Sequence, residues 1–237
     1  MPDPDFRFKQ FAVSHDRCAM KVGTDGVLLG AWASVEQCAT LLDVGTGSGL
    51  IALMLAQRNR NAEVMAIDID QNACLQARDN VKASPYKERI NVINTSFQQF
   101  ALHPPRLFDL VVSNPPFFTR SLLPPDAGRA DARHSVSLSL EALIRDAHRC
   151  LSPVGRLALI LPADRLAEMK ALSAHAGFML RRLTGVVPSP GKPVRRLLAE
   201  LSLSPGELEE TELLLEVSRH HYSPAYIELV RDFYLNL

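Results

Sequence analysis

The sequence lacks an excess of charge of either sign. Its 237 residues include 26 Lys and Arg residues and 26 Asp and Glu residues, so the formal net charge is zero. A strongly basic protein attracts polyanions over its whole surface, and a neutral chain has no such general attraction. A nucleic-acid partner, if the chain has one, must therefore be held by a local basic surface.

Long apolar runs and closely spaced cysteines are also missing. Apolar stretches such as Leu50–Ala56 and Leu157–Leu161 are far shorter than the ~18 residues that a membrane-spanning helix needs. The acidic start, residues 1–5, lacks the basic and apolar regions of a secretory signal. The four cysteines stand 20, 36 and 76 residues apart, which excludes a C-x-x-C zinc pattern and favours reduced core thiols. We therefore expect a cytoplasmic protein with no membrane partner and no metal.

What is present is an alternation of short apolar runs with longer segments of helical period. Strands are predicted at residues 41–44, 63–68, 90–93, 108–113 and 156–161, and helices at 50–57, 71–82, 140–151 and 165–175. Such alternation is typical of a parallel sheet covered by helices on both faces. Two later apolar runs, 178–187 and 196–203, are joined by a Pro/Gly loop and predict an antiparallel hairpin, and a helix over 223–234 closes the chain.

The first of these strands ends in a glycine-rich turn. Asp43 is followed by Gly45, Gly47 and Gly49, and a helix begins at Leu50. Glycine permits positive φ and close approach of a ligand to the backbone, and the start of a helix offers unpaired N–H groups. The dinucleotide fingerprint G-x-G-x-x-G needs a third glycine where Leu50 stands, which argues against an NAD-dependent oxidoreductase.

An acidic residue follows at the end of the next strand. Asp68 lies 19 residues after Gly49, and consecutive parallel strands end side by side. Its carboxylate can accept hydrogen bonds from both hydroxyls of a ribose. A tight turn and a helix-capping Asp would explain each feature separately, but together they predict a nucleoside-binding site on an open α/β sheet.

The fourth strand ends in Asn114-Pro115-Pro116-Phe117, at the edge of the sheet where ligands bind. Two prolines stiffen the backbone, and Pro115 offers only a carbonyl. The Asn114 side-chain oxygen and this carbonyl can accept both N–H bonds of an amino group on a planar ring. The nitrogen lone pair then becomes more nucleophilic, while Phe117 stacks on the ring. The alternative interpretation is a proline-rich turn that ends in a core Phe.

These three motifs resemble those of the class I S-adenosylmethionine-dependent amino methyltransferases. The segments Phe8–Phe11, His15–Gly26 and Phe233–Leu235 more specifically resemble the bacterial family that N6-methylates the adenine next to the anticodon of a valine tRNA. The resemblance implies a doubly wound, Rossmann-like α/β fold with seven strands, mostly parallel, of which the last is antiparallel. It also implies an N-terminal extension, residues 1–38, that covers the cofactor, followed by a methyltransferase domain at 39–237.

The resemblance further implies roles for single residues. The expected binding residues for S-adenosylmethionine are Lys21, Thr24, Asp25, Asp43, Gly45, Gly47, Gly49, Asp68, Ile69, Ser96, Phe97 and Asn114. The catalytic residues would be Asn114, Pro115 and Phe117. The expected substrate-binding residues are Pro116, Phe117, Arg133 and His134. Where the family often has an acidic residue against the adenine of the cofactor, this chain has Ser96 and Phe97, and a T-D-G turn alone would also explain Thr24 and Asp25.

An RNA partner must be bound by clusters of basic residues. They occur in the loop after Phe117 (Arg120, Arg129, Arg133, His134), around the last two strands (Arg181, Arg182, Lys192, Arg195, Arg196) and near the start (Arg7, Lys9, Arg17, Lys21). We expect a monomer that binds the anticodon stem-loop of a tRNA, although such clusters also occur as plain solvated surface. The alternatives are the same chemistry on guanine N2 of ribosomal RNA, on DNA adenine or on a protein glutamine, and a non-catalytic RNA-binding or cofactor-sensing module.

Overall fold

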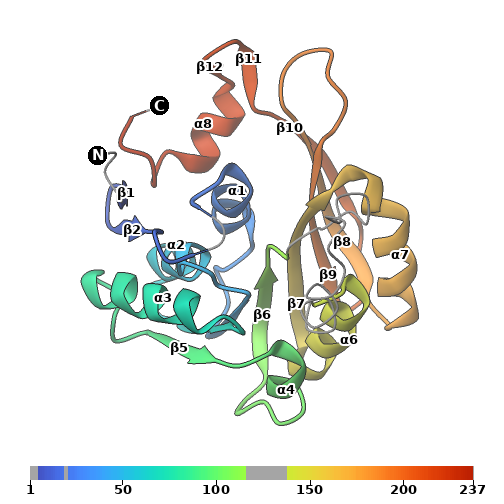
Figure 1. Cartoon of the computed structure of the whole chain (residues 1–237). Helices are drawn as coiled ribbons and strands as arrows, with labels where there is room; N and C mark the ends of the chain where they lie inside the picture. Colours follow the sequence, from blue (N-terminus) through green and yellow to red (C-terminus); the bar gives the residue numbers. More distant parts are fainter. Residues whose placement is uncertain (1–4, 19–20, 116–137, 237) are drawn as a thin grey trace, which may run out of the picture.

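The fold is organised around a twisted eight-stranded sheet (Figure 1). The computed structural model describes residues 5–18, 21–115 and 138–236. The sheet has the strand order β10-β8-β9-β7-β6-β3-β4-β5. In chain order its strands are β3 (Thr40–Val44), β4 (Glu63–Asp68), β5 (Ile90–Asn94), β6 (Phe108–Ser113), β7 (Leu151–Pro162), β8 (Met179–Val187), β9 (Arg196–Ser202) and β10 (Glu209–Leu214).

Helices cover both faces of the sheet. Apolar residues of α1 (Thr24–Trp32), α2 (Leu50–Arg58), α3 (Gln71–Ala83) and α8 (Pro224–Val230) form one core cluster against the first face. Those of α4 (Phe97–Phe100), α6 (Leu140–Cys150) and α7 (Leu166–His175) form a second cluster on the other face, and a short 3-10 turn, η1 (Ala163–Arg165), precedes α7. Figure 1 shows the two layers on either side of the strands. Within the described ranges, no helix is long and apolar enough to span a membrane.

The predicted fold class is confirmed. All seven predicted strands are present, and β9 is antiparallel to both β7 and β8 while the other neighbouring pairs are parallel. The eighth strand, β10, pairs parallel to β8 at the edge and is not predicted by the sequence pattern. Its sequence EETELL carries three glutamates and is mostly exposed, so it has no apolar run that would reveal a strand. Cys38, Cys74 and Cys150 are buried free thiols and Cys18 is half-buried.

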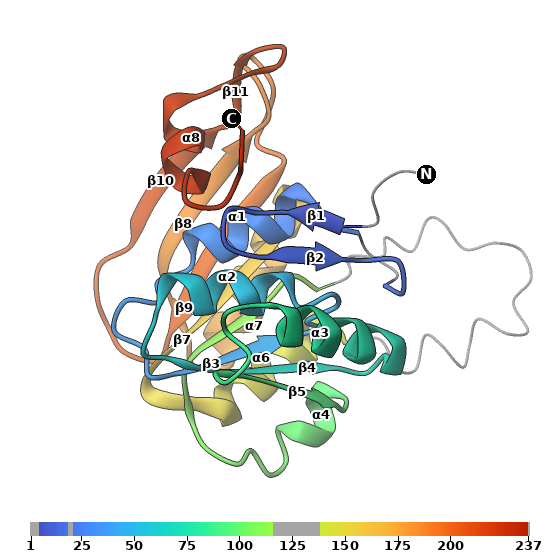
Figure 2. The ribbon, with the colours of Figure 1, turned by 90° about the vertical axis from the view of Figure 1, so that its left-hand side faces the viewer.

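The two ends of the chain meet on the α1–α3 face. A small sheet of β1 (Asp5–Arg7) and β2 (Ala12–Ser14) lies beside the C-terminal segment, and a second one, β11 (Glu216–Ser218) with β12 (His221–Tyr222), precedes α8 (Figure 2). Phe8 forms a backbone bridge with Tyr234, and the Lys9 N–H donates to the Phe233 carbonyl at 2.8 Å. The Phe8 ring also stacks on the rings of Phe11 and Tyr234. The two terminal segments therefore stabilise each other.

Helix α1 is fixed to the sheet at its C-terminal end by a buried polar network. Trp32 Nε1 donates to Thr184 Oγ1 at 3.0 Å, and the Arg182 guanidinium lies 3.9 Å from the centre of the Trp32 ring. Glu200, which is 2% exposed, accepts from the Ser34 N–H at 2.7 Å and from its hydroxyl at 3.0 Å. Residues of α1 thus share a core with the sheet. The predicted boundary after residue 38, between the N-terminal extension and the methyltransferase domain, stays a prediction.

Replacing Glu200 by Ala should destabilise the fold. The Ser34 N–H would lose its buried acceptor, and Arg182 would lose the carboxylate that lies 4.0 Å away. We therefore expect a loss of about 2–3 kcal/mol in the free energy of unfolding. Urea denaturation measures it, with the exposed Glu207→Ala as control. Equal stability of the two variants would show that the network contributes nothing.

Candidate functional site

The candidate site lies where the order of the strands reverses. From β3 the chain first adds β4 on one side and later β6 on the other, so the carboxyl ends of β3 and β6 flank the position at which open α/β sheets bind ligands. Ser113 Oγ donates to the Val44 carbonyl at 2.9 Å and ties these two ends together. The glycine turn follows β3 and Asn114 follows β6, so the two come directly after adjacent strands.

The three glycines of the turn have two different roles. Gly45, Gly47 and Gly49 have φ values of +73°, +55° and +83°, a region that favours glycine. A Cβ on Gly45 or Gly47 would meet no atom within 4 Å, so both line open space. A Cβ on Gly49 would lie 3.4 Å from Ala77 Cβ, so this glycine lets α2 start close to α3. Gly45 and Gly47 are thus placed to line a ligand, and Gly49 shapes the turn.

Asp43 is a fully buried carboxyl beneath the turn. Its Oδ2 accepts from Thr46 Oγ1 at 2.6 Å and from the Ala52 N–H at 3.1 Å. Its Oδ1 is buried without a hydrogen-bond partner among the described residues. Burial raises the pKa of Asp43 to about 7, against the two hydrogen bonds that lower it. An unpaired buried oxygen of this kind is suited to a donor or a positive charge that a ligand brings.

Asp68 connects the end of β4 to the glycine turn. Its Oδ2 accepts from the Gly47 N–H and its Oδ1 from the Asp70 N–H, both at 2.9 Å, and burial raises its pKa. A carboxylate oxygen can accept a second hydrogen bond, so both remain able to bind ribose hydroxyls. Next to it, the Ile69 side chain is 49% exposed and offers an apolar surface to a flat ring.

A residue that the motifs did not reveal sets the position of Asp68. Asn94, at the end of β5, donates from Nδ2 to the carbonyls of Asp68 and Ile69, at 2.9 and 3.1 Å. The signal in the sequence is a polar amide at the end of the strand next to β4. Ser96 Oγ caps α4 by accepting from the Gln99 N–H, and the Phe97 ring is 4% exposed in the core. Hence the Phe97 ring is not available to a ligand at this edge.

Of the Asn-Pro-Pro-Phe segment, the structure describes the first two residues. Asn114 is half-buried and Pro115 is buried, directly after β6. Pro116, Phe117, Arg133 and His134, together with Arg120 and Arg129, lie outside the described residues.

Two amides on α3 hold the N-terminal segment beside the glycine turn. Asn80 accepts from the Ser14 N–H at 3.0 Å and donates to the carbonyls of Ser14 and Ser48, each at 2.8 Å. Gln76 Oε1 accepts from the Arg17 N–H at 3.0 Å. Both amides are buried, and their spacing of four residues puts them on one face of the helix. Sequence reasoning did not select them, although buried amides at this spacing on an otherwise apolar face are a usable signal.

The N-terminal segment also comes close to Asp68, at Cys18. Burial and the negative charges of Asp68 and Asp70 raise the pKa of the Cys18 thiol to about 11, so this part of the segment is close to the end of β4. Lys21 and Thr24 are exposed.

At the N-terminus of α1, Asp25 pairs with Arg196 at 2.7 Å. Arg196 is the first residue of β9 and lies opposite Pro162, the last residue of β7. The ion pair therefore holds the start of α1 at the carboxyl edge of the sheet.

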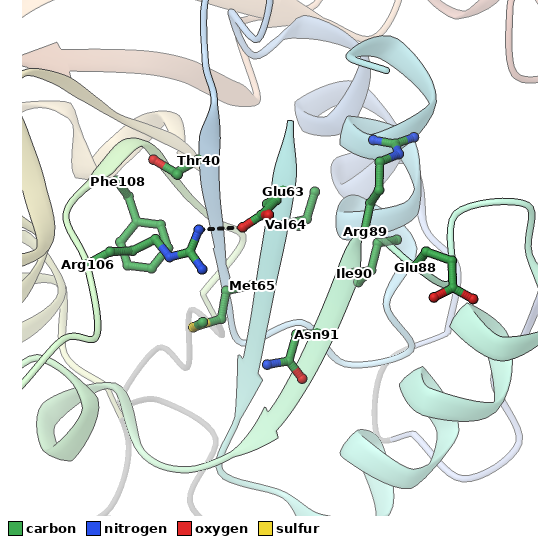
Figure 3. Close-up of a pocket in the computed structure, with 10 residues that line it drawn as sticks. All are labelled: Thr40, Glu63, Val64, Met65, Glu88, Arg89, Ile90, Asn91, Arg106 and Phe108. Carbon is green, nitrogen blue, oxygen red and sulfur yellow. Dashed lines mark hydrogen bonds and ion pairs between the residues drawn. The ribbon is translucent and has the colours of Figure 1, made fainter. Parts of the chain in front are cut away.

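A separate pocket of about 210 Å³ lies at the opposite edge (Figure 3). It is lined by the first residues of β3, β4, β5 and β6, among others. Arg106 pairs there with Glu63, and Arg89 donates to the carbonyls of Ala56, Asn59 and Ala62 at the end of α2. These charged groups are already bound within the protein, and the chemistry-bearing residues are at the carboxyl edge instead.

Replacing Asp43 by Asn should change how stability depends on pH. The folded protein binds the Asp43 proton more tightly than an unfolded chain with a pKa near 3.8, so stability falls as the pH rises from about 4 to about 7. The difference between the folded and unfolded pKa values of Asp43 corresponds to roughly 4 kcal/mol in the free energy of unfolding. The amide of the variant keeps an acceptor for Thr46 and Ala52 and carries no charge. Urea denaturation at several pH values should show that the free energy of unfolding of the variant increases relative to that of the wild type toward pH 8. Parallel stability curves for the variant and the wild type would contradict this.

Comparisons with known proteins identify the family of this chain. The family described as methyltransferase small domain matches residues 23–178. The tRNA1(Val) (adenine(37)-N6)-methyltransferase of Parabacteroides distasonis is 48% identical, with 100% of both chains covered. The enzyme of the same name from Trichodesmium erythraeum is 44% identical, with 97% of each covered.

Solved structures show the same fold. A predicted O-methyltransferase from Agrobacterium tumefaciens superposes with a TM-score of 0.67 at 23% identity, over 88% of this chain and 96% of that chain. The 16S rRNA N2 G1207 methyltransferase of T. thermophilus, in complex with AdoMet and guanosine, gives a TM-score of 0.58 at 20% identity, over 84% of this chain and 50% of that chain. With the full-length sequence matches, these findings show that the chain is a methyltransferase and belongs to the methyltransferase small domain family, together with the curated tRNA1(Val) (adenine(37)-N6)-methyltransferases.

Proposed function

We propose that this protein methylates N6 of the adenine at position 37 of a valine tRNA, with S-adenosylmethionine as methyl donor. The observation that carries the proposal is the 43–48% identity, over 97–100% of the chain, to several relatives that bear this name. We further propose that it acts in the cytoplasm, and we expect a monomer that binds the anticodon stem-loop.

The residues at the carboxyl edge fit S-adenosylmethionine. The unpaired Asp43 Oδ1 suits the positively charged amino group of its methionine part, and the open space at Gly45 and Gly47 admits that part close to the backbone. Asp68 would bind the ribose and Ile69 the adenine ring. When bound, the cofactor supplies a methyl group on a positively charged sulfur.

Asn114 and Pro115 would hold the target base. Two acceptors that bind both N–H bonds of an adenine amino group orient its lone pair out of the ring plane and make the nitrogen a better nucleophile. Because both acceptors are neutral, no strong base is required. An adenine in an anticodon loop is unpaired and can enter the site without opening a duplex. We further propose that Pro116, Phe117, Arg133 and His134 contact this base and the surrounding RNA.

We also propose that residues 1–38 cover the cofactor. The bonds from Asn80 and Gln76 place residues 14–17 beside the glycine turn, and the Asp25–Arg196 pair places the start of α1 at the same edge. Lys21 and Thr24 lie between these two anchors. A ligand on the glycine turn would then be enclosed between the sheet and the N-terminal segment.

Transfer of labelled methyl groups tests the substrate. Total tRNA, total rRNA, DNA and protein are each incubated with the protein and labelled S-adenosylmethionine, and the products are digested and identified. The proposal expects N6-methyladenosine from tRNA. Label in N2-methylguanosine, in DNA adenine or in glutamine would assign the same chemistry to another substrate, and absence of label from all four would favour a non-catalytic module.

Replacing Asn114 by Ala should abolish most of the transfer but leave cofactor binding nearly intact. The amino group would lose one of its two acceptors, and we expect transfer to fall by roughly 100-fold or more. Calorimetry with S-adenosylmethionine should give a Kd within a few fold of the wild type. Equal losses of transfer and cofactor affinity would contradict the assigned role, and Asn91→Ala, an exposed change on β5, is the matched control.

Replacing Asp68 by Ala should weaken cofactor binding first. Hydrogen bonds from two hydroxyls to a carboxylate are lost, so the Kd for S-adenosylmethionine should rise by at least roughly tenfold. Calorimetry checks this, with the exposed Asp232→Ala as control and the Tm of each variant confirming that the fold is kept. An unchanged Kd would mean that the ribose binds elsewhere.

A further inference from the structure

Two loops extend together from the end of the sheet formed by β8 and β10. One, residues 188–195, joins β8 to β9, and the other is the β11–β12 hairpin that follows β10. The Leu215 N–H donates to the Val187 carbonyl at 2.8 Å, and the Glu216 N–H to the Pro188 carbonyl at 3.1 Å. Figures 1 and 2 both show these loops side by side, beyond the end of the sheet. They form one surface, here called the tip surface, made of Lys192, Arg195, Arg219, His220, His221 and Tyr222.

Some basic side chains of this region bind other groups of the protein and some do not. Arg181 donates to the Pro205 carbonyl at 2.7 Å, Arg182 lies on the Trp32 ring, and Arg196 pairs with Asp25. The exposed side chains of Lys192 and Arg195, in contrast, have no ion-pair or hydrogen-bond partner among the described residues. Only these two members of the cluster predicted around β8 and β9 are therefore free to bind an anion.

The tip of the hairpin contains a residue with a left-handed backbone conformation. His220 has a φ of +64°, the one positive value at a residue other than glycine in the described part of the chain. This left-handed region is uncommon for residues other than glycine, and histidine is, with asparagine and aspartate, among the residues found there most often. Arg219 Nε donates to His220 Nε2 at 3.2 Å, which fixes the guanidinium against the imidazole. Both residues are exposed.

Tyr222 adds a supported aromatic ring. It is 41% exposed, and its ring centre lies 4.9 Å from that of Tyr226, which is buried. One side of the Tyr222 ring is thus backed by the core while the rest faces solvent. Exposed rings among cations are the means by which proteins bind unpaired bases and the adjoining phosphates.

We propose that the tip surface binds the tRNA substrate outside the pocket for the target base. This inference rests on the proposed function. The neighbouring edge of the sheet carries exposed glutamates at positions 207, 209, 210 and 212, which repel a polyanion. An RNA that reaches the site is therefore admitted at the tip and excluded from the β10 edge, so the charge pattern orients it.

The test compares two double variants with the same loss of charge. Lys192→Ala/Arg195→Ala removes the free cations of the tip, and Lys82→Ala/Lys87→Ala removes two exposed lysines near β5, at the other end of the sheet. Fluorescence anisotropy with a transcript of a valine tRNA should show a Kd about tenfold higher for the tip variant. The slope of log Kd against log salt concentration should be smaller for this variant by roughly 1–2. Affinity for S-adenosylmethionine should be unchanged in both variants.

Two single variants separate binding from a merely structural role. His220→Gly relieves the backbone strain, so its Tm should equal or exceed that of the wild type, yet its Kd for the tRNA transcript should rise severalfold. Tyr222→Leu keeps an apolar contact with Tyr226 and removes the ring, and its Kd should rise roughly tenfold. If the hairpin only supported the fold, the Kd of His220→Gly would not change.

The outcomes distinguish this inference from the proposed function. Loss of tRNA binding in the tip variants but not in the lysine control supports it, whether or not methyl is transferred into tRNA. Methylation of tRNA with the same KM in wild-type and tip variants overturns it while the proposed function stands. Equal losses of tRNA affinity in the tip variant and the lysine control overturn it as well. So does a Kd for the tRNA transcript that is the same in the tip variant and the wild type.

Discussion

The buried carboxyl of Asp43 is the constraint on which the rest of the site depends. One of its oxygens holds both the Thr46 hydroxyl and the Ala52 N–H, so a single group fixes the glycine turn and the first residues of α2. The other oxygen is buried and has no hydrogen-bond partner among the described residues. Burial of such a group opposes folding unless something compensates it. The turn is thus built for a ligand that brings a donor or a positive charge, at the expense of stability without one.

The same turn is held from outside by α3 and by the ends of the chain. Asn80 binds the Ser48 carbonyl of the turn and both polar backbone groups of Ser14, so the N-terminal segment and the turn share one buried amide. The segment is held in turn by the stacking of Phe8 on Tyr234. The terminal segments that resemble the tRNA methyltransferase family thus pack against each other. Their packing holds the N-terminal segment beside the glycine turn.

The fold and the centre of the site could be predicted from sequence because their signals are local. Apolar runs of strand and helix length set the layers, and the glycines after Asp43 require φ values that other residues rarely adopt. Strand β10 could not be predicted, since an edge strand of glutamates has no apolar pattern. Asn94, Gln76 and Asn80 were missed for a different reason. Their function lies in bonds to backbone groups 25–66 residues away, and no local pattern encodes such partners.

The zero net charge has a structural meaning once the basic residues are sorted by what they contact. Arg58, Arg89 and Arg182 neutralise helix ends and buried acceptors, and Arg196 holds α1, so much of the positive charge is used inside the fold. Among the basic residues around β8 and β9, Lys192 and Arg195 at the tip are left for a partner, and the glutamates of β10 border them. A neutral chain can therefore still present a polar, oriented field to RNA. Since these two cations would neutralise few phosphates, we expect the affinity for RNA to depend only weakly on salt.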